Sequence, residues 1–132
     1  MIREKSCGAV IFLRKNGQTL YLLETMRSGH IAMCKGHMEG EETEQETALR
    51  EIREETGLTV RLLPPFRRTE EYSPYPGCIK EVVYFLAEAD TETVKPQECE
   101  VRSISWLPFD EACAAITYEN DREILRSARQ FL

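Results

Sequence analysis

The segment from Thr43 to Gly57 limits the possible folds of this chain more than any other, because it specifies a helix and gathers acidic side chains along it. Thr43 and Glu46 have the spacing of a capping box, in which each side chain bonds the backbone N–H of the other residue. Gly57 is a typical residue to end a helix in the left-handed conformation. The sequence therefore predicts a helix between these two ends.

Acidic residues on this helix are concentrated on one side. At about 100° per residue, Glu44, Glu51, Glu54 and Glu55 fall within one stripe about 100° wide, beside the apolar face that would pack on a sheet. Like charges at these spacings repel, and Arg50 lies outside the stripe. The stripe is either a solvated helix surface or a metal site. A hard divalent cation with oxygen ligands would turn the repulsion into a binding site. The carboxylates are expected at the surface of a cleft.

The loop before the helix extends the pattern. Five residues separate Gly36 from Glu42, and seven more separate Glu42 from an Arg-Glu-Ile-x-Glu-Glu-x-Gly-Leu run that begins at Arg50 and ends at Leu58. So many positions at fixed spacing make chance agreement negligible. Residues 36–58 match the Nudix signature, and by this resemblance the chain is identified as a member of the Nudix hydrolase superfamily.

The Nudix resemblance implies an α/β fold, namely an α/β/α sandwich around a mixed β-sheet. The signature would form a loop–helix–loop, and residues 1–132 would form one domain. Periodicity and turn residues predict the other elements. Strands are expected over 6–14, 19–26, 60–63 (broken by Pro64-Pro65), 81–88 and 101–107, a hairpin at Asn16-Gly17, loops over 27–42 and 69–79, and helices over 110–116 and 119–132.

In Nudix hydrolases the signature glutamates hold divalent ions, here Mg²⁺ or Mn²⁺. A water molecule attacks phosphorus and displaces the leaving group. The resemblance implies that Glu51 and Glu55 are the main metal ligands, and that Glu54 is a further ligand or the water-activating base. It implies that the Gly36 carbonyl lies near the metal and that Arg50 orients the glutamates. Phosphoryl transfer depends on positioning and charge neutralisation, which bound metal ions supply.

The similarity continues beyond the signature, and over nearly the whole chain it resembles the asymmetric diadenosine tetraphosphate hydrolases. The segments that carry it are Cys7–Phe12, Lys35–Glu39, Phe66–Tyr72, Lys80–Glu88 and Glu100–Cys113. In such enzymes a tyrosine stacks on an adenine, lysines meet the phosphates, and a late glutamate can complete the metal shell.

By position, the stacking residue would be Tyr72, with Tyr75 in the same Pro-rich loop as the alternative. The late glutamate would be Glu100, a further metal ligand. His37 is either a phosphate contact or a structural hydrogen-bond partner. The substrate-binding residues that the resemblance implies are Lys35, His37, Tyr72, Tyr75 and Lys80.

Hydrolysis of diadenosine tetraphosphate to ATP and AMP is the function that this resemblance implies. One alternative is another Nudix pyrophosphatase, acting on nucleoside triphosphates, sugar nucleotides or 5′-triphosphorylated RNA ends. The other is a nucleotide-binding module without turnover. Because every carboxylate of the signature is present, the sequence favours an enzyme.

Composition limits the partners and the location. The net charge is −6 over 132 residues, which argues against an extended nucleic acid but allows a small polyphosphate bridged by a metal. Five scattered cysteines without a C-x-x-C pair predict reduced thiols, no zinc site and a cytoplasmic location. Neither a signal peptide nor a membrane span is expected, because no apolar run is long enough. Nothing in the sequence specifies an oligomeric state.

Overall fold

The computed structural model describes residues 1–132, which form seven β-strands and three α-helices. The strands are β1 (Ile2–Lys15), β2 (Gln18–Met26), β3 (Ile31–Ala32), β4 (Cys34–His37), β5 (Arg61–Tyr72), β6 (Cys78–Glu88) and β7 (Val101–Pro108). The helices are α1 (Glu44–Thr56), α2 (Phe109–Ala115) and α3 (Glu119–Phe131).

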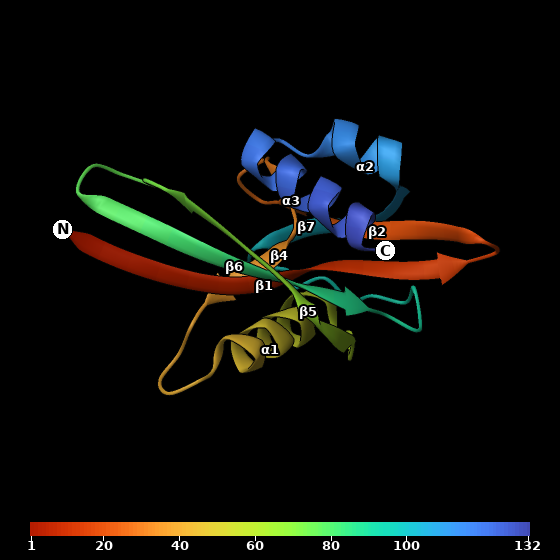
Figure 1. The fold of residues 1–132 in the computed structure, drawn as a ribbon, viewed down its shortest axis with the longest axis horizontal. Helices are drawn as coiled ribbons and strands as arrows, with labels where there is room; N and C mark the ends of the chain where they lie inside the picture. Colours follow the sequence, from red (N-terminus) through yellow and green to blue (C-terminus); the bar gives the residue numbers. More distant parts are fainter.

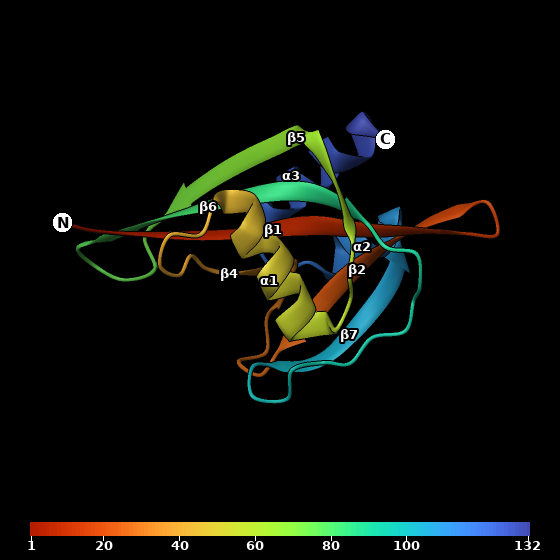
Figure 2. The ribbon, with the colours of Figure 1, turned by 90° about the horizontal axis from the view of Figure 1, so that it is seen from below.

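All of the strands belong to one mixed sheet. Its main path runs β3-β2-β1-β6-β5, while β4 adds to β1 and β7 adds to β2. β1 and β6 are parallel, and the other pairs are antiparallel. Figure 1 shows α1 on one face of the sheet and α2 and α3 on the other, and Figure 2 looks onto the α1 face. The predicted α/β/α sandwich is therefore confirmed.

Two apolar cores lie on the two faces of the sheet, and the side chains of β6 alternate between them. Val82 and Tyr84 pack with residues of α2 and α3, while Val83 and Phe85 pack with residues of α1. β6 lies between β1 and β5 in the sheet, and its two faces are buried by α1 on one side and by α2 and α3 on the other. This position explains the nearly continuous apolar run in its sequence.

The ends of α1 form as the sequence predicts. The Thr43 hydroxyl accepts a hydrogen bond from the Glu46 backbone N–H at 3.1 Å, and the Glu46 carboxylate accepts one from the Thr43 N–H at 2.8 Å. Gly57 follows the helix with a φ of 78°. The Asn16-Gly17 hairpin is also confirmed, because both residues have the positive φ that a type I′ turn requires.

Two predicted loops are wrong in part. Residues 27–42 include β3 and β4, and β4 pairs with Ser6–Ala9 of β1. Residues 69–79 include the end of β5 and the start of β6, so the connecting turn covers only 73–77. These strands form because they pair with distant segments, and such pairing leaves no periodicity in a short stretch of sequence.

β5 does not end at Pro64-Pro65, where the sequence suggested a break. Its pairing with β6 is interrupted between Leu62 and Arg67 and resumes with a shifted register. The prolines lie in this irregularity, where a missing N–H removes no ladder bond. The strand continues to Tyr72, which brings the end of β5 to the functional site described next.

Candidate active site

Helix α1 carries two of its glutamates into the interior. Ala48 and Ile52 are fully buried against the sheet, and the glutamates at adjacent positions on the helix are buried with them. Glu51 keeps only 9% of its surface exposed and Glu55 only 2%. The expectation of surface carboxylates is therefore wrong for these two, because the acidic stripe borders the packed face. Glu54, on the outer side of the stripe, stays exposed.

Arg50 connects the helix glutamates to the preceding loop. Its Nη1 donates to Glu51 Oε1 at 2.9 Å and to Glu54 Oε1 at 3.1 Å, and its Nε donates to Glu42 Oε2 at 2.6 Å. Its Nη2 donates to the backbone carbonyl of His37 at 2.8 Å. The bond from Arg50 lowers the pKa of Glu42 to about 2, so this carboxylate stays charged. Arg50 thus fixes the orientation of two carboxylates of α1.

Gly36 brings the backbone of β4 against Glu51. A Cβ atom at position 36 would lie 2.0 Å from Cδ of Glu51, much closer than two non-bonded carbon atoms approach. Only glycine fits here while the carboxylate keeps its place. The first glycine of the signature is therefore explained by close approach rather than by a turn.

A further carboxylate, Glu24, joins this site and was not predicted. It lies on β2 with 1% of its surface exposed. Ligand atoms of Glu24, Cys34 and Glu55 all lie within 4.8 Å of one another. A signal did exist in the sequence, because Glu24 is the only charged residue of an otherwise apolar and neutral strand.

Each of the two glutamates in this group has one carboxyl oxygen that lacks a protein partner. Glu24 Oε2 and Glu55 Oε1 are completely buried and accept no hydrogen bond. Burial raises the pKa of both carboxyls, and the adjacent Glu24 raises that of Glu55 further. Burial also raises the pKa of the Cys34 thiol, which stays protonated. Buried carboxyl oxygens without donors fit a hard divalent cation, which takes oxygen ligands.

The structure brings Glu24, and not Glu100, into this group. Glu100 is exposed, immediately before β7. Its backbone carbonyl accepts a hydrogen bond from the Arg27 N–H at 2.9 Å. The predicted role of Glu100 as a metal ligand therefore gains no support from the position of its side chain.

A pocket of about 460 Å³ opens beside β4, on the α3 face of the sheet. Tyr72 at the end of β5 and Tyr118 at the N-terminus of α3 both line it, together with Lys35 of β4. Tyr118 was not predicted, because no local pattern connects it with Tyr72. The full lining is His30, Lys35, Glu70, Tyr72, Ser73, Pro74, Tyr118, Asn120 and Asp121.

The other predicted substrate-binding residues have different positions. Lys80 is half-buried, and its pKa is lowered by burial and by the neighbouring charge of Lys35. Tyr75 is exposed outside the pocket, where its hydroxyl donates to Glu4 at 3.3 Å. The side chain of His37 is exposed at the end of β4 and does not line the pocket. The structure thus brings the two lysines and Tyr72 together, but not Tyr75 or His37.

The pocket and the acidic group meet at β4. Lys35 lines the pocket, and the next residue, Gly36, contacts Glu51 on the other face of the sheet. β4 pairs with β1 only, so its other edge is open. Two consecutive residues of β4 therefore connect the pocket with the carboxylates.

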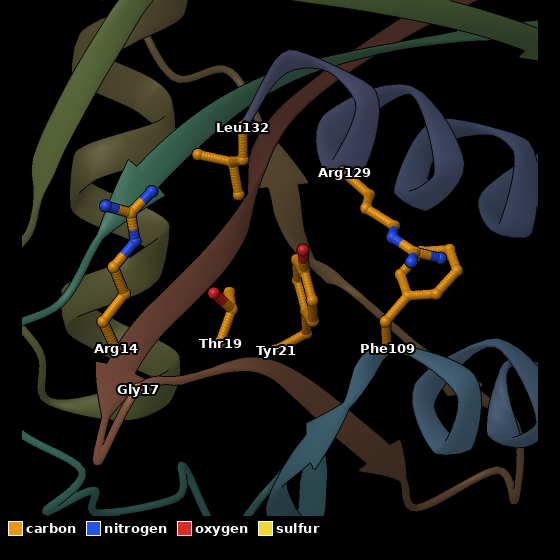
Figure 3. Close-up of a pocket in the computed structure, with 7 residues that line it drawn as sticks. All are labelled: Arg14, Gly17, Thr19, Tyr21, Phe109, Arg129 and Leu132. Carbon is orange, nitrogen blue, oxygen red and sulfur yellow. The ribbon is translucent and has the colours of Figure 1, made fainter.

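A second pocket, of about 420 Å³, lies beside the β1–β2 hairpin (Figure 3). Arg14, Tyr21, Phe109 and Arg129 are among its lining residues, and the Arg129 guanidinium lies 4.2 Å from the centre of the Phe109 ring. No acidic side chain lines this pocket. It contains no residue of the signature.

The family comparison agrees with this geometry. The model of the Nudix domain matches residues 3–128. This chain belongs to the Nudix family. Together with its relatives, the match shows that the protein is a Nudix hydrolase, an enzyme that acts on pyrophosphate bonds.

Several Nudix relatives cover most of the chain. The asymmetrical bis(5′-nucleosyl)-tetraphosphatase of Sus scrofa is 32% identical over 145 residues, which cover 97% of this chain and 95% of the relative. An 8-oxo-(d)GTP phosphatase of Mycolicibacterium smegmatis is 38% identical over 95 residues, which cover 72% of this chain and 29% of the relative. The structure of a C. elegans Ap4A hydrolase binary complex is similar with a TM-score of 0.89 at 26% identity, covering 97% of this chain and 96% of that one.

The helices also bear on membrane association. None of them combines the length and the apolar character that crossing a lipid bilayer requires.

Proposed function

We propose that this Nudix hydrolase cleaves dinucleoside polyphosphates asymmetrically and converts diadenosine tetraphosphate to ATP and AMP. The observation that carries the proposal is the pocket in which Tyr72 and Tyr118 lie with Lys35, one residue from Gly36 and the acidic group. A base pocket connected to the carboxylates through β4 suits an asymmetric cut, because one nucleoside is held while a bond at a fixed distance from it breaks. The tetraphosphatase of Sus scrofa is named for such an asymmetric reaction.

Mg²⁺ or Mn²⁺ is the proposed cofactor. The carboxylates of Glu51 and Glu55, with the Gly36 carbonyl, would hold it, since both ions prefer oxygen ligands. When bound, such an ion neutralises phosphate charge and makes water more acidic. Glu24 lies beside Glu55 and adds a buried negative charge that favours a cation at this place.

The side chains around the cation site prepare the reaction. Arg50 holds Glu51 and Glu54 in fixed orientations, so that neither carboxylate has to be ordered during the reaction. Glu54 is the exposed member of the group and is the proposed general base, which accepts the proton of the attacking water. Lys35 and Lys80 bind the phosphates, because a negative ligand relieves the repulsion between their neighbouring ammonium groups.

Tyr72 and Tyr118 are the proposed stacking residues. Stacking on an aromatic ring contributes on the order of 1–3 kcal/mol per base, so Tyr72→Ala and Tyr118→Ala should each raise KM about ten- to hundredfold. Tyr75→Ala is the matched control, since this ring lies outside the pocket and should leave KM near the wild-type value. A raised KM for the Tyr75 variant alone would contradict the assignment.

Product identification tests the proposed function. Diadenosine tetraphosphate is incubated with the protein and Mg²⁺, and the products are separated by ion-exchange chromatography. ATP and AMP in equal amounts are expected, whereas two molecules of ADP would contradict the asymmetric cut. Excess EDTA should stop the reaction and Mg²⁺ should restore it. Faster hydrolysis of nucleoside triphosphates would instead favour the activity named for the Mycolicibacterium smegmatis relative.

A further inference from the structure

Two acidic side chains, Glu70 and Asp121, line the same pocket as the two tyrosines. β5 provides Glu70 and Tyr72, which are two residues apart and share one face of the strand. The start of α3 provides Tyr118 and Asp121, which are three residues apart and lie on one side of the helix. Each element thus contributes one aromatic ring and one carboxyl group. Neither acid belongs to the Nudix signature, and the reaction described above gives neither a role.

Neither carboxyl group forms an ion pair. Asp121 keeps only 4% of its surface exposed, and Glu70 Oε2 is completely buried without a hydrogen-bond partner. Arg122, next to Asp121 in the chain, donates instead to the backbone carbonyls of Cys113 and Ile116. A buried carboxyl oxygen without a protein partner, at the wall of a pocket, indicates a polar ligand that supplies the missing hydrogen bond.

Glu70 keeps a proton at neutral pH. Burial and the adjacent Asp121 raise the pKa of Glu70 to about 8, although the Lys35 ammonium acts in the opposite direction. His30 also faces the pocket, and its pKa is lowered by burial and by Lys35, so the ring stays neutral. On β6, beneath the pair, the Tyr84 hydroxyl is buried and has no partner. Glu70 is therefore the acid that donates a hydrogen bond, and the adjacent oxygens of Asp121 are available as acceptors.

This pair presents one donor and two acceptor oxygens to the edge of a stacked base. Guanine has the complementary edge, because its O6 accepts while N1–H and N2–H donate side by side. The Glu70 acid would donate to O6, and the two oxygens of Asp121 would accept from the two N–H groups. Adenine uses only one donor and one acceptor of the pair. A phosphate group would be repelled by the charge of Asp121 and is directed to the lysines.

We propose that Glu70 and Asp121 are the specificity-determining residues of the base pocket, and that they bind the Watson–Crick edge of guanine. The proposal rests on the proposed function, since it takes the pocket as the base-binding part of a hydrolase. It adds that the preferred dinucleoside polyphosphate carries guanosine at the end held by this pocket. Diadenosine tetraphosphate remains a substrate that forms fewer hydrogen bonds to the protein.

Comparison of guanosine and inosine substrates tests the role of Asp121, because inosine lacks only the 2-amino group. With saturating Mg²⁺, kcat/KM for diguanosine tetraphosphate should exceed that for diinosine tetraphosphate by about tenfold or more. Asp121→Asn should bring this ratio close to one, since one of the two acceptor oxygens is lost. Glu70→Gln is the matched control and should keep the ratio, because its amide still donates to O6. If Asp121 had a purely structural role, its replacement would lower kcat/KM for both substrates by the same factor. A wild-type ratio near one would overturn the proposal.

Binding of the monophosphates gives a second readout that does not depend on turnover. Titration calorimetry in the presence of Mg²⁺ should show GMP bound more tightly than IMP. As the pH rises through about 8, the wild-type affinity for GMP should fall relative to that of Glu70→Gln, because Glu70 loses the proton that it donates. Titration of the ligand is common to both proteins and cancels in the ratio.

The outcomes separate the two proposals. A wild-type preference for GMP without cleavage of any dinucleoside polyphosphate would refute the proposed function and support the guanine site. Cleavage of all dinucleoside substrates at equal rates, with GMP and IMP bound equally, would refute the guanine site alone. A pH-independent ratio between wild type and Glu70→Gln would refute the role of the Glu70 proton.

Discussion

Replacement of Glu24 by glutamine should stabilise the metal-free protein, because it removes one of two carboxyls that are buried without donors. The ligand atoms of the group lie within 4.8 Å of one another, and two unit charges at this limiting distance would repel by about 3.5 kcal/mol at an effective dielectric constant of about 20. The proton that one acid retains reduces this figure, so the expected gain in unfolding free energy is on the order of 1–2 kcal/mol near neutral pH. For a domain of this size, such a gain raises Tm by about 3–8 °C.

Metal binding should change in the opposite direction. The same substitution removes a negative charge from the proposed cation site, so the affinity for Mg²⁺ should fall and the metal-induced rise in Tm should shrink. Thermal unfolding followed by circular dichroism, in EDTA and over a series of Mg²⁺ concentrations, measures both effects, since a ligand stabilises the folded state according to its Kd. A tenfold loss of affinity removes about 1.4 kcal/mol of stabilisation at saturating metal.

Glu111→Gln is the matched control for this experiment. Glu111 is exposed on α2, which covers the sheet face opposite α1, and its replacement removes the same formal charge (Figure 1). It should leave both the metal-free Tm and the response to Mg²⁺ near the wild-type values. A lower metal-free Tm for Glu24→Gln, together with an unchanged metal-induced rise, would make Glu24 a packing residue with no part in the cation site.

Three further measurements test the acidic group. In EDTA, the unfolding free energy of the wild type should fall as the pH rises above about 4.5, because folded Glu55 keeps a proton that the unfolded chain loses; urea titrations that show a rise instead would contradict this effect of burial. Glu51→Gln should lower kcat at saturating Mg²⁺ by about a hundredfold or more, and an unchanged kcat would remove Glu51 from the ligands. Gly36→Ala should displace the Glu51 carboxylate and weaken Mg²⁺ binding measured by calorimetry, since its Cβ would lie 2.0 Å from Cδ of Glu51; wild-type affinity would contradict that contact.

The sequence alone determined the features that depend on nearby residues. The Thr43 capping box and the Gly57 stop define α1 through hydrogen bonds within a few residues. Helix geometry then places Glu51, Glu54 and Glu55 on one side of α1 in any fold that keeps the helix. The spacing of these residues was sufficient to recognise the Nudix family and, with it, the sandwich that the structure confirms.

Only the tertiary structure decided which distant residues join them and how deeply they are buried. Glu24 meets Glu55 because β2 and α1 contribute to the same sheet face, and Tyr118 joins Tyr72 in one pocket because α3 packs on β5. The burial of Glu55 likewise depends on the sheet that α1 covers. The physical reason is that periodicity relates consecutive residues of one element, whereas contact and burial depend on which surfaces of different elements pack together. No local pattern in the sequence specifies that packing.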